Sequence, residues 1–290
     1  MKIMYMDCGM GAAGDMMTGA LLELLGEDER SRFIEDFNRL GIPGVTMEAG
    51  SSEKCGIKGT HVSMMINGEE EGADGHIHSH GHGHDEGHAH THEHSHESVH
   101  EHTHEHVHTH ADGTVHSHTH SGMEYIEHIV RDHLDIPDKV KADIMAVYGI
   151  IADAESKAHG VPVTDIHFHE VGTADAIADI TAVCMLMDRI GADKVVASAI
   201  NTGSGTVRCA HGILPVPAPA TAYILTGIPV YNNHIKSELT TPTGAALLRH
   251  FVSEFGNMPV MRTEKTAYGM GTKDFDAANC LRIFLGEEGF

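Results

Sequence analysis

Residues 3–16 read Ile-Met-Tyr-Met-Asp-Cys-Gly-Met-Gly-Ala-Ala-Gly-Asp-Met. The first four of these residues are apolar and predict a short strand. A glycine-rich turn follows, and residues 16–25 are an apolar stretch with helical spacing that ends at Gly26. The stretch therefore predicts a strand, a tight loop and a helix as the first unit of the fold.

The same alternation of elements continues along the chain. Pro137 is placed to open a helix over residues 137–160, and the proline-rich residues 214–221 predict an extended segment that enters another helix. The other predicted helices are 126–134, 173–190 and 245–255, and the other predicted strands are 45–49, 57–66, 195–199, 260–266 and 281–285. Because helices and strands alternate, we expect a mixed domain of the α/β class.

A histidine-rich segment interrupts this domain. Of the 28 histidines, 19 lie in residues 76–120, mostly at every second position. Such a segment has too few large apolar residues to offset the entropy cost of ordering. We therefore predict a long disordered His-rich insertion over residues 68–121, between an amino-terminal part (1–67) and the remainder (122–290) of the α/β domain.

The insertion is also predicted to bind metal. Neutral imidazole is a preferred ligand of nickel, copper and zinc. Redundant weak sites suit metal storage or local enrichment, while a low-complexity segment with incidental affinity is the alternative. The histidines spaced four residues apart are the candidate ligands: His88, His92, His96, His100, His104 and His108.

The charge and the cysteines exclude some functions. The net charge is −23, so no basic face for nucleic acid or for an anionic membrane surface is expected. The five cysteines are scattered, without a Cys-x-x-Cys pair, which is typical of a reducing compartment. No signal peptide and no apolar run long enough to span a bilayer are recognisable. We expect a cytoplasmic protein.

The most informative candidate site lies in residues 166–180, Ile-His-Phe-His-Glu-Val-Gly-Thr-Ala-Asp-Ala-Ile-Ala-Asp-Ile. In an extended backbone, His167 and His169 face the same way, with Glu170 beside them. Asp175 and Asp179 then lie one turn apart on the following helix. These five residues predict a divalent-metal site. A buried histidine pair with acidic residues at a helix start is the alternative.

Two loops are candidates for binding an anion. In the first, Gly9, Gly11 and Gly14 allow close backbone approach, Asp7 and Asp15 flank the loop, and Cys8 is either a reactive thiol or a small core residue. The spacing is neither that of a P-loop nor that of a dinucleotide-binding loop.

The second candidate anion-binding loop contains Thr241, Thr243 and Gly244, which open a helix. Ordinary capping of that helix is the alternative to anion binding. Arg208, Cys209 and His211 form a further polar turn, in which a structural role is the alternative for His211.

These motifs together resemble the LarC family, the nickel-insertion proteins of nickel-pincer cofactor biosynthesis. The resemblance rests on Asp-Cys…Gly-Ala-Ala-Gly-Asp-Met (7–16) and His-Phe-His-Glu-Val-Gly…Asp…Asp-Ile (167–180). It also rests on Gly-Ser-Gly-Thr-Val-Arg-Cys-Ala-His-Gly-Ile-Leu-Pro-Val-Pro-Ala-Pro-Ala-Thr (203–221), Glu-Leu-Thr-Thr-Pro-Thr-Gly-Ala-Ala-Leu (238–247) and Tyr-Gly-Met-Gly-Thr-Lys-Asp (268–274).

The resemblance implies a nickel insertase of the lyase class. Its substrate would be pyridinium-3,5-bisthiocarboxylic acid mononucleotide, and its reaction would consume CTP with Mg or Mn. It also implies that the family's carboxy-terminal CTP-binding domain is absent here and is supplied by a separate carboxy-terminal half. A lactate racemase-type apoenzyme would receive the cofactor, and a homo-oligomer is possible.

Two other functions stay open at this point. One is nickel storage or delivery without bond-making chemistry, with the histidine-rich insertion as the working part. The other is a metal-dependent hydrolase built on His167, His169 and Glu170.

Overall fold

The computed structural model describes residues 1–70, 105–109, 115–119, 122–166, 168, 171–209 and 211–289. The chain divides into two compact units, one of Met1–Glu71 with Ser121–Phe290 and one of Gly72–His120. In the second unit, strands β5 (Glu105–Thr109) and β6 (Val115–Thr119) pair antiparallel. Most of the predicted disordered insertion lies outside the described residues, so that prediction is untested.

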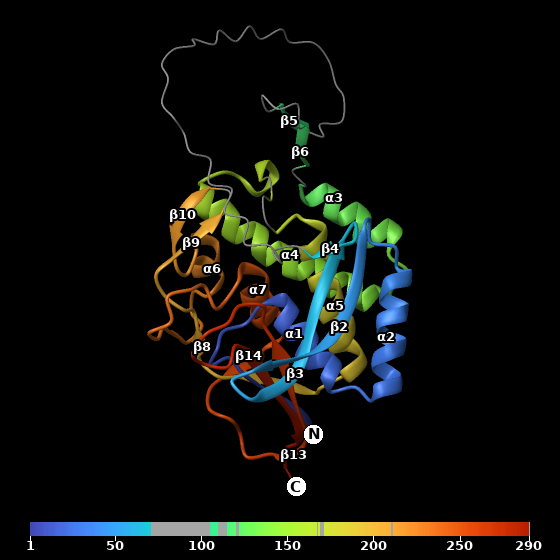
Figure 1. The fold of residues 1–290 in the computed structure, drawn as a ribbon, viewed down its shortest axis with the longest axis vertical. Coiled ribbons are helices and arrows are strands. Elements are labelled where there is room, and N and C mark those ends of the chain that lie inside the picture. The colour runs from blue at the N-terminus through green and yellow to red at the C-terminus, as the bar shows by residue number, and fades with distance from the viewer. Residues whose placement is uncertain are drawn as a thin grey trace, which may run out of the picture. The chain divides into compact units, whose positions relative to one another are not determined.

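The largest sheet of the described residues is mixed (Figure 1). Its interior strand β1 (Lys2–Asp7) pairs parallel with β7 (Lys194–Ala197) and antiparallel with β14 (Cys280–Glu287). The full order is β12 (Glu254–Phe255), β7, β1, β14, β13 (Arg262–Met270), β3 (Ile57–Ile66) and β2 (Val45–Lys54), with β4 (Glu69–Glu70) paired to β3. The predicted mixed α/β class is confirmed.

Helix α1 (Gly14–Glu23) lies unusually close to this sheet because glycines meet at the crossing. A Cβ atom added at Gly269 of β13 would lie 1.8 Å from the Met16 carbonyl oxygen, and one at Gly19 would lie 2.5 Å from that of Thr60. Almost all of α1 is buried. Close packing of this kind fixes the position of the loop that precedes the helix.

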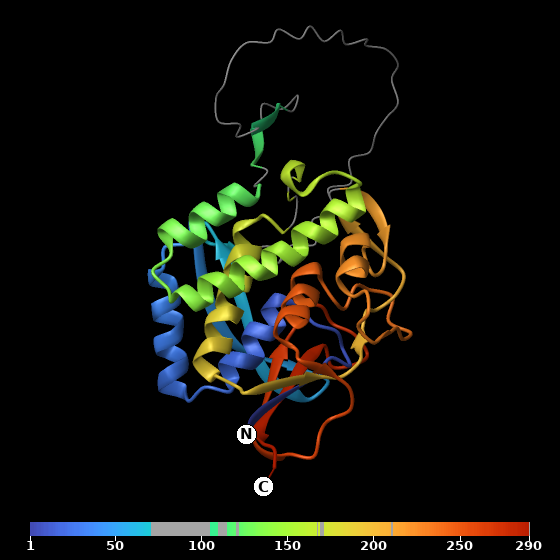
Figure 2. The same ribbon diagram turned by 180° about the vertical axis from the view of Figure 1, so that it is seen from behind.

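The remaining helices pack around α1. Helix α5 (Ala174–Ile190) contacts both α1 and β3, and α4 (Asp138–His159) packs over α5 and α7 (Pro242–Phe251), as Figure 2 shows from behind. The other helical elements are α2 (Glu27–Arg39), α3 (Met123–His128), the π-helical turn η1 (Ile129–His133), the 3₁₀ turn η2 (Val163–Asp165) and α6 (Pro219–Ile224). One apolar core joins these layers.

Two short strand pairs complete the fold. Strands β9 (Thr206–Cys209) and β10 (Gly212–Pro215) form a hairpin, and β8 (Ile200–Asn201) pairs parallel with β11 (Val230–Tyr231). The predicted extended segment then enters α6 through a cis peptide bond at Val216–Pro217.

The structure corrects the end of one predicted helix and adds a helix that was not predicted. Helix α7 ends at Phe251 rather than at residue 255, because Ser253 donates from its backbone N to the Val195 carbonyl oxygen and Glu254 joins the sheet beside β7. Helix α2 was not predicted, since its buried side consists only of Phe33 and Phe37. All five cysteines are free. Among the described residues, no helix combines the length and apolarity needed to cross a membrane.

Candidate functional site

Five separate parts of the chain meet at a cavity of about 190 Å³, here called the aspartate cavity. The amino-terminal loop contributes Asp15, helix α5 contributes Asp175 and Asp179, and the start of α7 contributes Thr241 and Thr243. The full lining is Ala13, Gly14, Asp15, Val62, Ser63, Met64, Asp175, Asp179, Thr241, Thr243 and Thr272. The structure thus brings together six of the residues that the sequence singled out.

Three helices begin at the aspartate cavity. Helix α1 begins at Gly14, α5 at Ala174 and α7 at Pro242. Thr241 caps α7, since its Oγ1 accepts from the Gly244 backbone N at 3.2 Å and lies 2.9 Å from the Thr243 Oγ1. Backbone N–H groups at helix starts attract anions. The cavity therefore combines positive helix ends with three carboxylates.

Glycines allow this close assembly. A Cβ atom at Gly14 would lie 2.3 Å from Asp179 Oδ2, and one at Gly244 would lie 2.2 Å from the Ala12 carbonyl oxygen. Asp179 is only 7% exposed. No larger residue fits at either position without moving the neighbouring segment.

Tyr148 of α4 shows that the surroundings of the aspartates disfavour further negative charge. Its ring is fully buried, and among the described residues its hydroxyl has no hydrogen-bond partner. Burial raises the pKa of Tyr148 well above its ordinary value, and the charges of Asp179, Cys184 and Asp175 raise it further. The phenol of Tyr148 therefore stays neutral.

The first half of the amino-terminal loop does not line the aspartate cavity. Asp7 Oδ2 pairs with Arg282 Nη2 at 2.5 Å, and Asp7 Oδ1 accepts from the Gly9 backbone N at 3.1 Å. Gly11 has a φ of +81° and lies against Leu239, where a Cβ atom would come within 1.9 Å of the carbonyl oxygen. These residues hold the loop in place.

Cys8 is part of the core at this position. Its side chain is fully buried, and burial, followed by the charge of Asp7, raises the pKa of its thiol to about 12. Because the thiolate is the reactive form of cysteine, this environment suppresses its reactivity. The geometry agrees with the core-residue alternative.

The predicted metal ligands are only partly described. His167, His169 and Glu170 lie outside the described residues, as do His88, His92, His96, His100 and His104, while His108 is seen only as backbone of β5. Within the described ranges, no group of three or more His, Cys, Asp or Glu side chains could hold a metal ion. The predicted five-residue site therefore remains a prediction.

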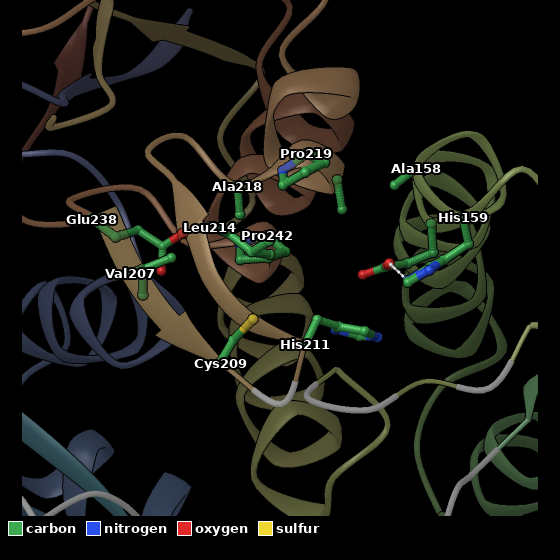
Figure 3. Close-up of a pocket in the computed structure, with 12 residues that line it drawn as sticks. Ala158, His159, Val207, Cys209, His211, Leu214, Ala218, Pro219, Glu238 and Pro242 are labelled. Atoms are coloured by element: carbon green, nitrogen blue, oxygen red, sulfur yellow. Dashed lines mark ion pairs between the residues drawn. The ribbon is translucent and has the colours of Figure 1, made fainter. Parts of the chain in front are cut away.

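A second cavity of about 310 Å³ lies between α4, the β9–β10 hairpin and α6 (Figure 3). His159 Nε2 lies 3.4 Å from Glu155 Oε2, and the rings of His159 and His211 have centroids 4.8 Å apart. Its lining is Glu155, Ala158, His159, Val207, Cys209, His211, Leu214, Ala218, Pro219, Ala220, Glu238 and Pro242. The segment that holds Thr241 and Thr243 borders both cavities, because Pro242 lies between these threonines.

Sequence reasoning missed Glu155 and His159. A Glu–His pair four residues apart at the end of a helix was the available signal, but such pairs are common on exposed helix surfaces. In the fold, His211, in the turn between β9 and β10, lies beside His159 of α4, as Figure 3 shows.

Comparisons with known proteins match nearly the whole chain. The family model described as "Nickel insertion protein" matches residues 4–289. Several relatives carry the name "Pyridinium-3,5-bisthiocarboxylic acid mononucleotide nickel insertion protein". The one from Geobacillus kaustophilus is 36% identical over 99% of this chain and 60% of its own length. The one from Clostridium acetobutylicum is 39% identical over 99% of this chain and 64% of its own length.

The chain thus spans about three fifths of the length of these relatives. No solved structure matches. The match of the family model to residues 4–289 shows that the chain belongs to the nickel insertion protein family.

Proposed function

We propose that this chain forms the nickel- and substrate-binding part of an enzyme that inserts nickel into pyridinium-3,5-bisthiocarboxylic acid mononucleotide. Family membership and the names of the relatives support this reaction. Nickel is then a substrate, since it leaves the protein in the product.

The observation that carries the proposal is the meeting of three helix starts and three aspartates at one cavity. A mononucleotide brings a phosphate, which the starts of α1 and α7 and the hydroxyls of Thr241 and Thr243 are suited to bind. The carboxylate of Asp15 would repel a bare phosphate, so a bridging Mg or Mn ion fits beside it. The rest of the loop would hold these groups in position, through Asp7, Cys8, Gly9 and Gly11.

Asp175 and Asp179 would hold nickel in transit, together with His167, His169 and Glu170. During insertion, nickel would exchange these protein ligands for two sulfurs and one ring carbon of the substrate. That ring carbon would lose its proton. Carboxylate oxygen is a harder ligand than thiocarboxylate sulfur, and nickel prefers the softer donor. The aspartates would therefore release the metal to the substrate readily.

The whole reaction is proposed for this chain together with the sequence that corresponds to the rest of the relatives' length. That part would bind CTP with Mg or Mn, as a separate carboxy-terminal half. A lactate racemase-type apoenzyme as recipient, a homo-oligomer and a cytoplasmic location are further parts of the proposal.

A reconstituted reaction tests this function. The chain would be mixed with nickel, CTP, the bisthiocarboxylate mononucleotide and the separately made carboxy-terminal part, and the nickel-containing product would be followed by mass spectrometry. We expect Asp175→Asn and Asp179→Asn to lower the initial rate about tenfold or more, as loss of a metal ligand does. Asp153→Asn, an exposed aspartate of α4, is the matched control. Product formation at full rate without this chain, or in the double variant, would contradict the proposal.

A further inference from the structure

The last histidine of α3 and the last histidine of the π-helical turn η1 place their ring nitrogens side by side. His128 Nε2 and His133 Nε2 are 2.9 Å apart. The two rings are perpendicular, with centroids 4.5 Å apart. The π-helical turn η1 makes this possible, since residues five apart lie above one another in a π-helix. Short π-helical turns occur often at functional sites.

A carboxylate fixes the orientation of the first ring. Asp132 Oδ2 lies 2.8 Å from His128 Nδ1, and both side chains are exposed. A carboxylate accepts, so Nδ1 carries the proton and the lone pair of Nε2 faces His133. Metal-binding histidines commonly have their second nitrogen held by a carboxylate in this way.

We propose that His128 and His133 form a two-imidazole site for Ni(II), with Asp132 as the positioning residue. A metal–nitrogen bond of about 2.05 Å places nitrogens about 2.9 Å apart in adjacent square-planar or octahedral positions, and about 3.3 Å apart in tetrahedral ones. The observed 2.9 Å fits the first geometry. Nickel and copper adopt it, whereas structural zinc is tetrahedral.

Metal binding needs a tautomer change at His133 and a small rotation of the rings, so that both lone pairs converge on the ion. Without metal, His133 Nε2–H donates to His128 Nε2. With metal, His133 carries its proton on Nδ1, so both Nε2 lone pairs face the ion and no proton is released. Two protein ligands leave the other positions to water, which makes the bound ion exchangeable.

The place of this site in the chain suggests what it does. The last histidine of the insertion is His120, and α3 begins at Met123. A short chain connection would give any metal bound to the insertion a high effective concentration at His128 and His133. The pair is therefore suited to take up nickel from the predicted metal-binding histidines of the insertion and to hold it at the end of η1. This inference concerns binding alone and does not depend on the insertion chemistry.

Hydrogen–deuterium exchange at C2 of each imidazole tests the site in the intact chain, with Ni(II) as the only addition. Mass spectrometry of peptides measures the exchange of each histidine separately. Protection of histidines in the insertion by nickel is therefore distinguished from protection of His128 and His133. We expect nickel to slow exchange at His128 and His133 about threefold or more, because a bound metal occupies the ring nitrogen. His250, whose Nε2 lies 2.9 Å from Asp143 Oδ1, is the matched histidine that pairs with a carboxylate.

Variants separate a metal site from a hydrogen-bonded pair. In His133→Gln, which changes an exposed residue, nickel protection of His128 should be lost. Asp132→Asn should raise the nickel concentration for half-protection about tenfold, as loss of such a partner does. Asp135→Asn, an exposed aspartate nearby, should leave that concentration unchanged. Equal exchange with and without nickel at His128, or equal protection at His128 and His250, would overturn the inference. CTP and the mononucleotide are absent, so failure of the insertion assay would not affect this result.

Discussion

Gly14 and Asp179 are in direct contact, and a methyl group at Gly14 would come within 2.3 Å of the Asp179 carboxylate oxygen Oδ2. The start of α1 therefore rests on a carboxylate of α5. The contact couples the glycine-rich loop to the aspartates, so a change in one is expected to displace the other.

Gly14→Ala should disturb this contact directly. Because Asp179 is buried and cannot swing into solvent, we expect a loss of about 1–3 kcal/mol in the free energy of unfolding, as overpacking costs. The rate of nickel insertion should fall with it. Urea unfolding and the reconstituted assay measure the two effects.

Gly149→Ala is the matched control, since it lies within α4 and a Cβ atom there has no neighbour within 4 Å. A helical glycine replaced by alanine gains about 0.5–1 kcal/mol. Equal stability of the two variants would show that the Gly14 contact is not constraining.

Thr241→Ala should weaken both the helix and the substrate site. Loss of the cap to Gly244 N should cost about 1 kcal/mol of stability. Loss of the hydroxyl from the cavity should also raise KM for the mononucleotide. Thr241→Ser keeps the hydroxyl and should preserve both values. A variant with unchanged KM would exclude Thr241 from substrate binding.

The raised pKa of the Cys8 thiol predicts that the folded protein loses stability at alkaline pH. Burial raises the pKa of its thiol from 9.0 to about 12 in the folded protein, whereas the unfolded chain ionises near the ordinary value. Between these values the folded state holds one more proton than the unfolded state, so stability falls as pH rises. The contribution of Cys8 is about 1.4 kcal/mol for each pH unit.

Urea unfolding of Cys8→Ala at pH 8 and pH 10 checks this. The variant should be less stable than the parent chain at pH 8, because a buried side chain is lost, but its stability should fall less between the two pH values. Met17→Ala, which removes a fully buried side chain that does not ionise, is the control and should keep the parent's pH dependence. The same dependence in Cys8→Ala and the parent would contradict the prediction.

Replacing residues 72–120 by a short Gly-Ser linker should leave the first unit folded, since that segment forms a separate compact unit. The unfolding midpoint should stay the same, and the number of bound nickel ions should drop. With free nickel in excess, an insertase keeps its rate. A storage protein would lose its function, so retained insertion activity separates the two.

The sequence alone determined the elements whose signal is local. The apolar run and glycines of residues 3–16 gave β1, its loop and α1, and the four-residue spacing of Asp175 and Asp179 placed both on one side of α5. Helix α2 could not be predicted from the sequence, because its two buried phenylalanines are too few for a clear hydrophobic periodicity. The sequence also extended α7 past Phe251, because it could not show the pairing of Glu254 with β7.

Only the tertiary structure decided which parts of each motif face a cavity. The antiparallel register of β1 and β14 sets Asp7 opposite Arg282, 275 positions away, where the two side chains form an ion pair. The packing of α1, α5 and α7 brings Asp15, Asp179 and Thr241 to one point. Helical and strand periods arise from neighbouring residues and can be read along the chain. Strand register and helix contact depend on side chains far apart in sequence, and packing alone selects them.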